Sequence, residues 1–228
     1  MDIILSSISQ GLLWSVMAIG VYLTFRILDI ADMTAEGSYP LGAAVCATGI
    51  VNGLNPLLAT FLAMIAGMGA GLISGLLHTK LKIPALLTGI VTLTGLYSIN
   101  LKILGKANVA LLKQETLVTQ LQDFGLAKTN AVLVIGIIFV LAVVGVLTLL
   151  LNTQIGLAIR STGDNIPMSE ANGINVDRMK IYGYMISNGL IALCGALLTQ
   201  NNGYADLNSG TGTIVIGLAS VIIAEVIL

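Results

Sequence analysis

Long apolar runs alternate with short polar breaks along the whole chain. A membrane-spanning helix needs about 20 mostly apolar residues. The runs that reach or approach this length are 4–28, 38–53, 56–78, 84–104, 130–152, 179–200 and 212–228. The pattern predicts an all-α polytopic membrane protein, with about seven membrane segments in a single transmembrane domain over residues 1–228.

Two of these runs are too short for an ordinary span. The run 38–53 follows a polar stretch at 29–38, and the run 212–228 follows a polar, glycine-rich stretch at 201–213. Non-helical backbone is tolerated at membrane depth only where it is buried in protein or lines a cavity. We therefore expect two half-helices or re-entrant segments, which are typical of transport pathways. Because 38–53 could either cross or turn back, the side of the amino terminus stays open.

A polar island of 25 residues, 156–180, separates two uncharged runs at 129–159 and 181–205. Its charged groups would be costly in hydrocarbon, so the island must lie at a membrane face. Pro167 near the start of a short segment and Gly173 after it predict one short helix, with Asp164 or Asn165 as its cap. Arg160 is expected at the end of the preceding helix, where the dipole favours a cation. Such a segment is suited to docking another protein.

Basic residues near the span ends give a weak orientation. If the island is cytoplasmic, six of them fall inside (Arg26, Lys80, Lys82, Arg160, Arg178 and Lys180) and four outside (Lys102, Lys106, Lys113 and Lys128). The other long hydrophilic connection, 105–129, would then be external.

Composition agrees with the apolar pattern and excludes several classes of protein. Hydrophobic residues make up 56% of the chain and charged residues 9%, against about 25% charged in a soluble domain. The net charge is −1 and there is no basic block, so no nucleic acid partner is indicated. Cys46 and Cys194 lie in apolar runs and are expected to act as small hydrophobic side chains. A single histidine, His78, makes neither a metal site nor a catalytic set, so we expect no cofactor, no metal and no catalytic residues.

Polar side chains within the spans are the remaining candidates for function. Thr88, Thr92 and Asn100 are spaced by four and eight residues and share one helix stripe. With Asn188 and Glu225 they could line a solute pathway, or they could only bond to neighbouring helices. The spans contain no series of Asp, Glu, His or Arg side chains of the kind that relays protons in a proton-coupled carrier. This favours an uncharged or zwitterionic solute and energy supplied by a partner.

Small residues also recur on one helix face. Gly67, Gly71 and Gly75 are spaced by four, which permits close approach of a neighbouring helix. Packing within the bundle is the preferred interpretation, and a dimerisation face is the alternative.

Two stretches resemble a known family. IGLAIRSTGDN at 155–165 and ANGI at 171–174 are similar to a cytoplasmic loop of the permease subunits of bacterial ABC importers for branched-chain amino acids, ribose-type sugars and nucleosides. GLASVIIAE at 217–225 resembles the family's G-L-A-A-V-I-I-G-E segment. The likeness covers nearly the whole chain. Ser161 and Ala224 depart from the usual Ala and Gly. Family members continue for several more helices, so we expect this carboxyl terminus to be truncated.

The resemblance implies a function and partners. The chain would be a multi-pass permease of the bacterial plasma membrane, surrounded by lipid. Its partners would be a cytoplasmic ABC ATPase, an extracytoplasmic substrate-binding lipoprotein and a second permease, identical or different. The loop 156–178 would be the coupling helix, through residues Gly156, Arg160, Gly163, Asp164, Asn165, Glu170, Ala171, Gly173 and Ile174.

The solute is less well determined. An amino acid is the preferred solute, on the resemblance alone, and a nucleoside or sugar remains an alternative. A secondary carrier and a non-transport scaffold are the alternatives from other classes.

Overall fold

The computed structural model describes residues 2–112, 114–123, 125 and 127–227. Within them, five helices are long and apolar enough to cross a membrane. They are α1 (Asp2–Tyr22) with its π-helical end η1 (Leu23–Ile27), α3 (Pro56–Lys80), α4 (Ala85–Leu104), α6 (Lys128–Leu151) and α9 (Val176–Asn202). The shorter α2 (Ala35–Val51) and α10 (Thr213–Ile227) complete the seven predicted segments. The all-α polytopic fold is therefore confirmed.

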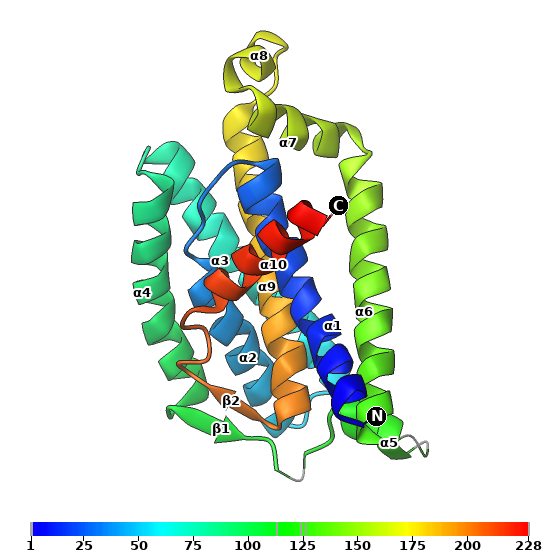
Figure 1. The fold of residues 1–228 in the computed structure, drawn as a ribbon. Coiled ribbons are helices and arrows are strands. Elements are labelled where there is room, and N and C mark those ends of the chain that lie inside the picture. Colours follow the sequence, from blue (N-terminus) through cyan, green and yellow to red (C-terminus); the bar gives the residue numbers. More distant parts are fainter. Residues whose placement is uncertain (1, 113, 124, 126, 228) are drawn as a thin grey trace.

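The bundle has two distinct ends (Figure 1). At one end, α7 (Gln154–Asp164) lies across the helices and α8 (Ile166–Ala171) projects beyond them. At the other end lie the amino terminus, α5 (Leu117–Asp123) and a small antiparallel pair of strands, β1 (Asn108–Ala110) and β2 (Tyr204–Asp206). We call these the α7–α8 end and the β1–β2 end. Lys113, which the count of basic residues placed outside, falls outside the described residues.

Both short helices begin inside the bundle. Residues 28–34 run back from the α7–α8 end before α2 begins, and α2 then completes the crossing to the β1–β2 end (Figure 1). Residues 207–212 enter from the β1–β2 end, and α10 rises from there toward the α7–α8 end. These segments are half-helices, as expected, and α2 crosses instead of turning back. The amino terminus consequently lies at the end opposite α7 and α8.

Helix α9 is the centre of the bundle. In its most apolar window 72% of the residues are buried, against 28–39% in the other four long helices. The glycines of α3 face it, because a Cβ on Gly67 or Gly71 would collide with the carbonyl oxygen of Asn188 or Tyr184. The predicted close approach is therefore made within the chain, between α3 and α9.

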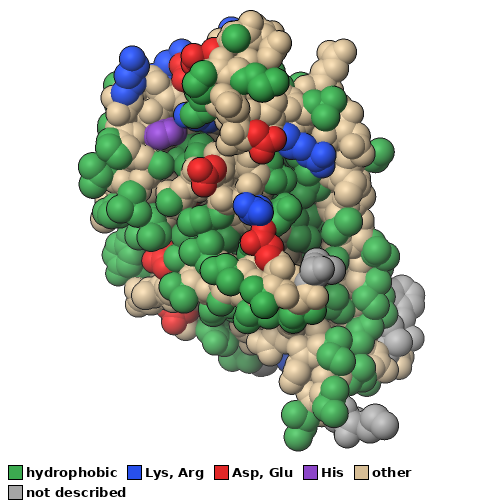
Figure 2. All heavy atoms as spheres, turned by 45° about the horizontal axis from the view of Figure 1, so that its top comes forward, with side chains coloured by type: hydrophobic (Ala, Val, Ile, Leu, Met, Phe, Trp, Pro, Cys, Tyr) green, Lys and Arg blue, Asp and Glu red, His purple; other side chains and the backbone are tan. Residues whose placement is uncertain are grey.

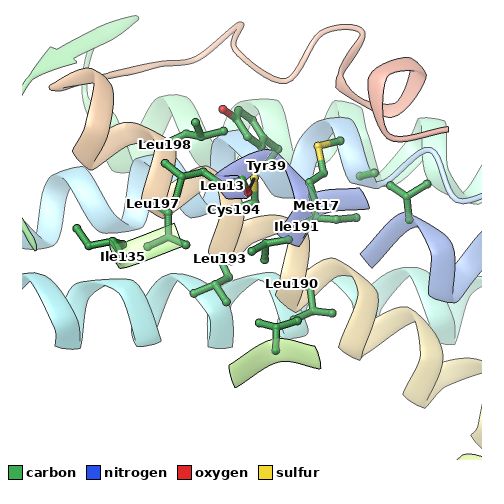
Figure 3. Close-up of a cluster of buried hydrophobic side chains, with 14 of the residues drawn as sticks. Leu13, Met17, Tyr39, Ile135, Leu190, Ile191, Leu193, Cys194, Leu197 and Leu198 are labelled. Carbon is green, nitrogen blue, oxygen red and sulfur yellow. Dashed lines mark hydrogen bonds between the residues drawn. The ribbon is translucent and has the colours of Figure 1, made fainter. Parts of the chain in front are cut away.

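A cluster of buried apolar side chains fills the space between α1, α2, α6 and α9 (Figure 3). The Trp14 ring stacks on Tyr39 with centroids 5.7 Å apart. Cys194 belongs to this cluster and Cys46 to a second one, and both are free and buried, as predicted. Because lipid is as apolar as this interior, close packing contributes more here than removal of surface from water.

Candidate functional site

The polar island folds into two helices, where one was predicted. Helix α7 begins where the Gly156 N–H donates to the Thr153 hydroxyl, at 3.3 Å. Gly156 is needed at this corner, since a Cβ there would overlap the backbone of Leu150 and Leu151. Arg160 lies within α7 and is exposed. The interpretation of Arg160 as the end of the preceding helix is therefore wrong, because α6 already ends at Leu151.

Helix α8 has the local signals that the sequence predicted. Of the two candidate caps, Asn165 is the one used: its Oδ1 accepts from the Met168 N–H at 3.0 Å. Pro167 occupies the first turn, where it removes no helical hydrogen bond. Gly173 follows the helix with φ of 78°, a left-handed conformation that favours glycine.

Helix α8 exposes most of its surface. Ile166 and Met168 are 41% and 64% exposed. Residues Asp164, Asn165, Glu170, Ala171 and Gly173 are exposed as well, Gly163 and Ile174 are half-buried, and Gly156 is buried. Ser169 is buried and its hydroxyl bonds to Ser161, which joins α8 to α7. In Figure 2, where this end comes forward, apolar side chains lie among acidic and basic ones. Projecting apolar side chains with a polar surround are typical of a protein-docking surface.

The underside of α7 rests on the end of α1. A Cβ on Gly163 would overlap the carbonyl oxygen of Ile27, in the π-helical turn η1. Ile159 is fully buried and packs in one cluster with Leu28, Ile30 and Tyr184. Helix α7 thus touches both η1 and residues 28–34, which lead into α2. Single π-helical turns occur frequently at functional sites.

Residues 28–34 carry an acid into the bundle. Asp32 is 1% exposed. Its Oδ1 accepts from the Thr34 N–H at 2.9 Å, and its Oδ2 accepts from the Asn188 amide at 2.7 Å. The Asn188 Oδ1 in turn accepts from the Ser38 hydroxyl at 2.6 Å.

Asp32 was not among the residues predicted from the sequence as candidates for function. The sequence places it in the polar stretch 29–38, outside the spans, whereas the structure buries it within the bundle. The available signal was its place directly before a half-helix, where the preceding backbone must lie at membrane depth.

A second polar chain links the same segment to α3 and α4. The Thr34 hydroxyl bonds to Ser74 at 2.8 Å, Ser74 donates to Thr92 at 3.0 Å, and Thr92 donates to the Thr88 carbonyl at 2.9 Å. Thr88 and Thr92 are 0% and 6% exposed. Of these two predicted pathway residues, Thr92 bonds across helices to Ser74, and the Thr88 hydroxyl donates to the Ile83 carbonyl just before its own helix.

Asn100 behaves differently from the other two. It is 1% exposed, and its amide donates to the Gly37 carbonyl at 3.2 Å. Its Oδ1 is one of two buried side-chain atoms that have no hydrogen-bond partner among the described residues. Asn100 also lines a hollow of about 310 Å³ between α2, α4 and residues 207–211. Among the predicted pathway residues it is the one with an unused polar atom at a cavity.

Glu225 lies apart from these residues. It forms an ion pair with Arg26 of η1 at 2.5 Å, and the two side chains are 42% and 63% exposed. The pair joins α10 to the end of α1 near the α7–α8 end. Within the described part of the chain, no group of three or more His, Cys, Asp or Glu side chains could hold a metal ion.

Comparison with known proteins places this chain among permeases. A family described as "Branched-chain amino acid transport system / permease component" matches residues 3–227. A tyrosine transport system permease protein of Clostridioides difficile (strain R20291) is 44% identical, over 96% of this chain and 72% of that protein. An uncharacterised protein of Rickettsia prowazekii (strain Madrid E) is 35% identical, over 99% of this chain and 78% of that protein.

A third relative is more distant. An autoinducer 2 import system permease protein of Yersinia enterocolitica is 28% identical, over 92% of this chain and 56% of that protein. No solved structure matches the chain. The match over nearly the whole length, together with the apolar helices, shows that this multi-pass inner membrane protein belongs to the branched-chain amino acid permease family of bacterial ABC importers.

Proposed function

We propose that this chain forms the membrane pathway for an amino acid and that α7 and α8 couple it to a cytoplasmic ATPase. The observation that carries this proposal is the structure of α8 and its exposed surface. It is capped by Asn165, tied to α7 through Ser169, and projects apolar side chains beyond the bundle. A short, rigid, projecting helix can enter a groove of a partner and transmit its movement.

The contacts beneath α8 provide a route for that movement. Helix α7 is joined to α8 by the Ser161–Ser169 hydrogen bond and packs on η1 through Gly163. Through Ile159 it also packs on the segment that carries Asp32. Displacement of α8 would therefore move residues 28–34 and the start of α2. Packed elements of this kind switch between discrete arrangements instead of deforming smoothly.

An amino acid is supported as the solute by the tyrosine transport permease, which is 44% identical to this chain. The autoinducer 2 import permease is 28% identical, so a sugar-like solute has weaker support. By the same resemblance, a substrate-binding lipoprotein would deliver the solute at the β1–β2 end, where the connection 105–129 would be external. A second permease, identical or different, would complete the membrane unit.

Capture of the ATPase tests the coupling surface. We would express the tagged full chain in a bacterium that carries its natural partners and compare Met168→Glu with Leu81→Glu. Leu81 is 64% exposed, as is Met168, and the loop that carries it also lies at the α7–α8 end. The charge on α8 should abolish capture of an ATPase identified by its phosphate-binding loop, and ATP-dependent tyrosine uptake should fall at least about tenfold.

The control variant should keep both properties. Equal amounts of folded protein in the membrane would show that neither change disturbs insertion. Normal ATPase capture by Met168→Glu would refute α8 as the docking helix.

A further inference from the structure

The hollow beside Asn100 lies where the two half-helices begin. Its walls come from the first turns of α2, from the middle of α4 and from residues 207–211, which lead into α10. The Gly212 N–H donates to Glu36 Oε1 at 3.0 Å, so the start of α10 is tied to the first turn of α2. Short helices that begin at membrane depth are typical of solute sites in transporters.

Two buried or half-buried side chains of the hollow, Asn100 and Glu36, form its inner wall and can accept hydrogen bonds. The Asn100 Oδ1 is buried and accepts no hydrogen bond among the described residues. Glu36 is half-buried and uses one carboxylate oxygen for Gly212. The residues that line the hollow include neither lysine nor arginine. A carboxylate at membrane depth with no cation beside it is costly, and so is an unpaired buried oxygen. A bound cationic donor would relieve both costs.

The outer rim differs from the inner wall. Tyr97, Asn208 and Thr211 add two hydroxyl groups and an amide, which can donate to a carboxylate. Leu93, Leu207 and Pro40 supply apolar surface. Tyr97 is 48% exposed and Thr94 is exposed in the middle of α4. The Thr94 hydroxyl already bonds to the Ile90 and Val91 carbonyls of its own helix, so it adds no free donor to the rim.

We infer that this hollow binds the ammonium group of a transported amino acid, through Glu36 and Asn100, with the carboxylate of the solute toward the rim. The inference rests on the proposed function for its choice of solute. A volume of about 310 Å³ is at the lower end of small-molecule sites. The hollow lies on the β1–β2 side of the start of α2, where a solute delivered at that end would arrive first. Glu36 and Asn100 would then determine specificity for an amine.

Binding to the purified permease tests the site directly. We would prepare the intact permease–ATPase complex in lipid nanodiscs and measure saturation-transfer NMR with four probes. They are L-tyrosine, tyramine, 3-(4-hydroxyphenyl)propionate and ribose. Tyrosine and tyramine should bind. The propionate and ribose lack an amine and should bind at least about tenfold more weakly, since they offer no charge-assisted donor to the inner wall.

Glu36→Gln keeps an oxygen for the Gly212 N–H but removes the charge, and it should weaken binding of both amines by about tenfold or more. Asn100→Leu should also weaken amine binding. Thermal stability should change little, because removal of a buried unpaired oxygen offsets the loss of the bond to the Gly37 carbonyl. A purely structural Asn100 would instead lose stability. Glu115→Gln, the same chemical change at an exposed glutamate outside the hollow, should alter nothing.

The outcomes separate this site from the wider proposal. Unchanged amine binding in Glu36→Gln, while the complex still imports tyrosine, would overturn the site and leave the proposed function in place. Binding of ribose that is lost in Glu36→Gln, with no binding of either amine, would overturn both the ammonium assignment and the amino acid as solute. Capture of the ATPase through α8 would be unaffected by either result.

Discussion

Helix α9 contacts α3 and the polar residues that lead into α2 in different ways. Against α3, backbone lies on backbone, because Gly67 and Gly71 leave no side chain between the helices. At residues 32–38 the contact is made by side-chain hydrogen bonds, with Asn188 between Asp32 and Ser38. Farther along α2, Gly42 and Gly195 again bring the two backbones together. The contacts between backbones tolerate only one fit, since any added atom collides. The polar contact can exchange partners at constant volume. We infer that α3, α9 and the part of α2 around Gly42 move as one body. The polar junction formed by Asp32, Asn188 and Ser38 is then where the bundle can rearrange.

The largest effect should come from a large side chain in the contact that Gly67 and Gly71 of α3 make with α9, which we call the glycine seam. In Gly71→Leu the new side chain would collide with the Tyr184 carbonyl and with Met185, both on α9. Backbone cannot yield here without separating the two helices, so most of the protein should fail to fold. Size-exclusion chromatography of a fluorescent fusion in mild detergent would measure the folded fraction.

Gly69→Leu is the matched control. It lies two residues away on the same helix, and a Cβ there meets nothing within 4 Å. Leucine should be tolerated at this position and even favoured by about 1 kcal/mol of helix propensity. Equal loss of folded protein in both variants would show that the seam is not the rigid contact proposed.

An intermediate effect should come from the polar junction. In Asp32→Asn, an amide N–H₂ replaces one of two oxygens that accept from Thr34 and Asn188, so a buried donor loses its partner. The expected cost is about 1–3 kcal/mol in stability. Tyrosine uptake should fall further than the folded fraction does, if this junction also controls rearrangement. Thermal unfolding and uptake would be measured on the same membranes.

Exchange of the two side chains would sharpen this result. In the double variant Asp32→Asn with Asn188→Asp, the carboxylate and the amide trade places. The new carboxylate can accept from residue 32 and from Ser38, while the new amide oxygen accepts from Thr34. The pair should therefore recover most of the lost stability, by an interaction energy of about 0.5–3 kcal/mol. Additive losses would contradict direct coupling between the two positions.

The same comparison explains what the sequence could predict. The seam is visible in one helix alone, because three glycines at a spacing of four define a face. The cap, proline and glycine of α8 are also local signals, and they predicted its start and end. Helix α7 was missed because the break between α6 and α7 depends on the close contact of Gly156 with Leu150 and Leu151.

The polar junction depends on contacts between distant parts of the chain. Asp32 and Asn188 are 156 residues apart, and no periodicity connects them. The free oxygen of Asn100 likewise exists only because its amide reaches Gly37 on another helix. Local signals thus predict helices and caps, while the site arises where two half-helices start inside the bundle.

The smallest effect should come from the exposed acid. Glu225→Gln makes the same change of carboxylate to amide as Asp32→Asn, but its partner Arg26 and the glutamate itself are largely exposed. Exposed ion pairs contribute about 0–1 kcal/mol, since solvent screens both charges. The apparent melting temperature should shift by less than about 4 °C, and tyrosine uptake should stay near that of the wild type. Reversal of the pair, Arg26→Glu with Glu225→Arg, should change the melting temperature and the uptake no more than Glu225→Gln does. Uptake could instead fall as far as in Asp32→Asn while the fold stays intact. That result would show that the contact between η1 and α10 also controls transport, and the contrast between buried and exposed acids would no longer hold.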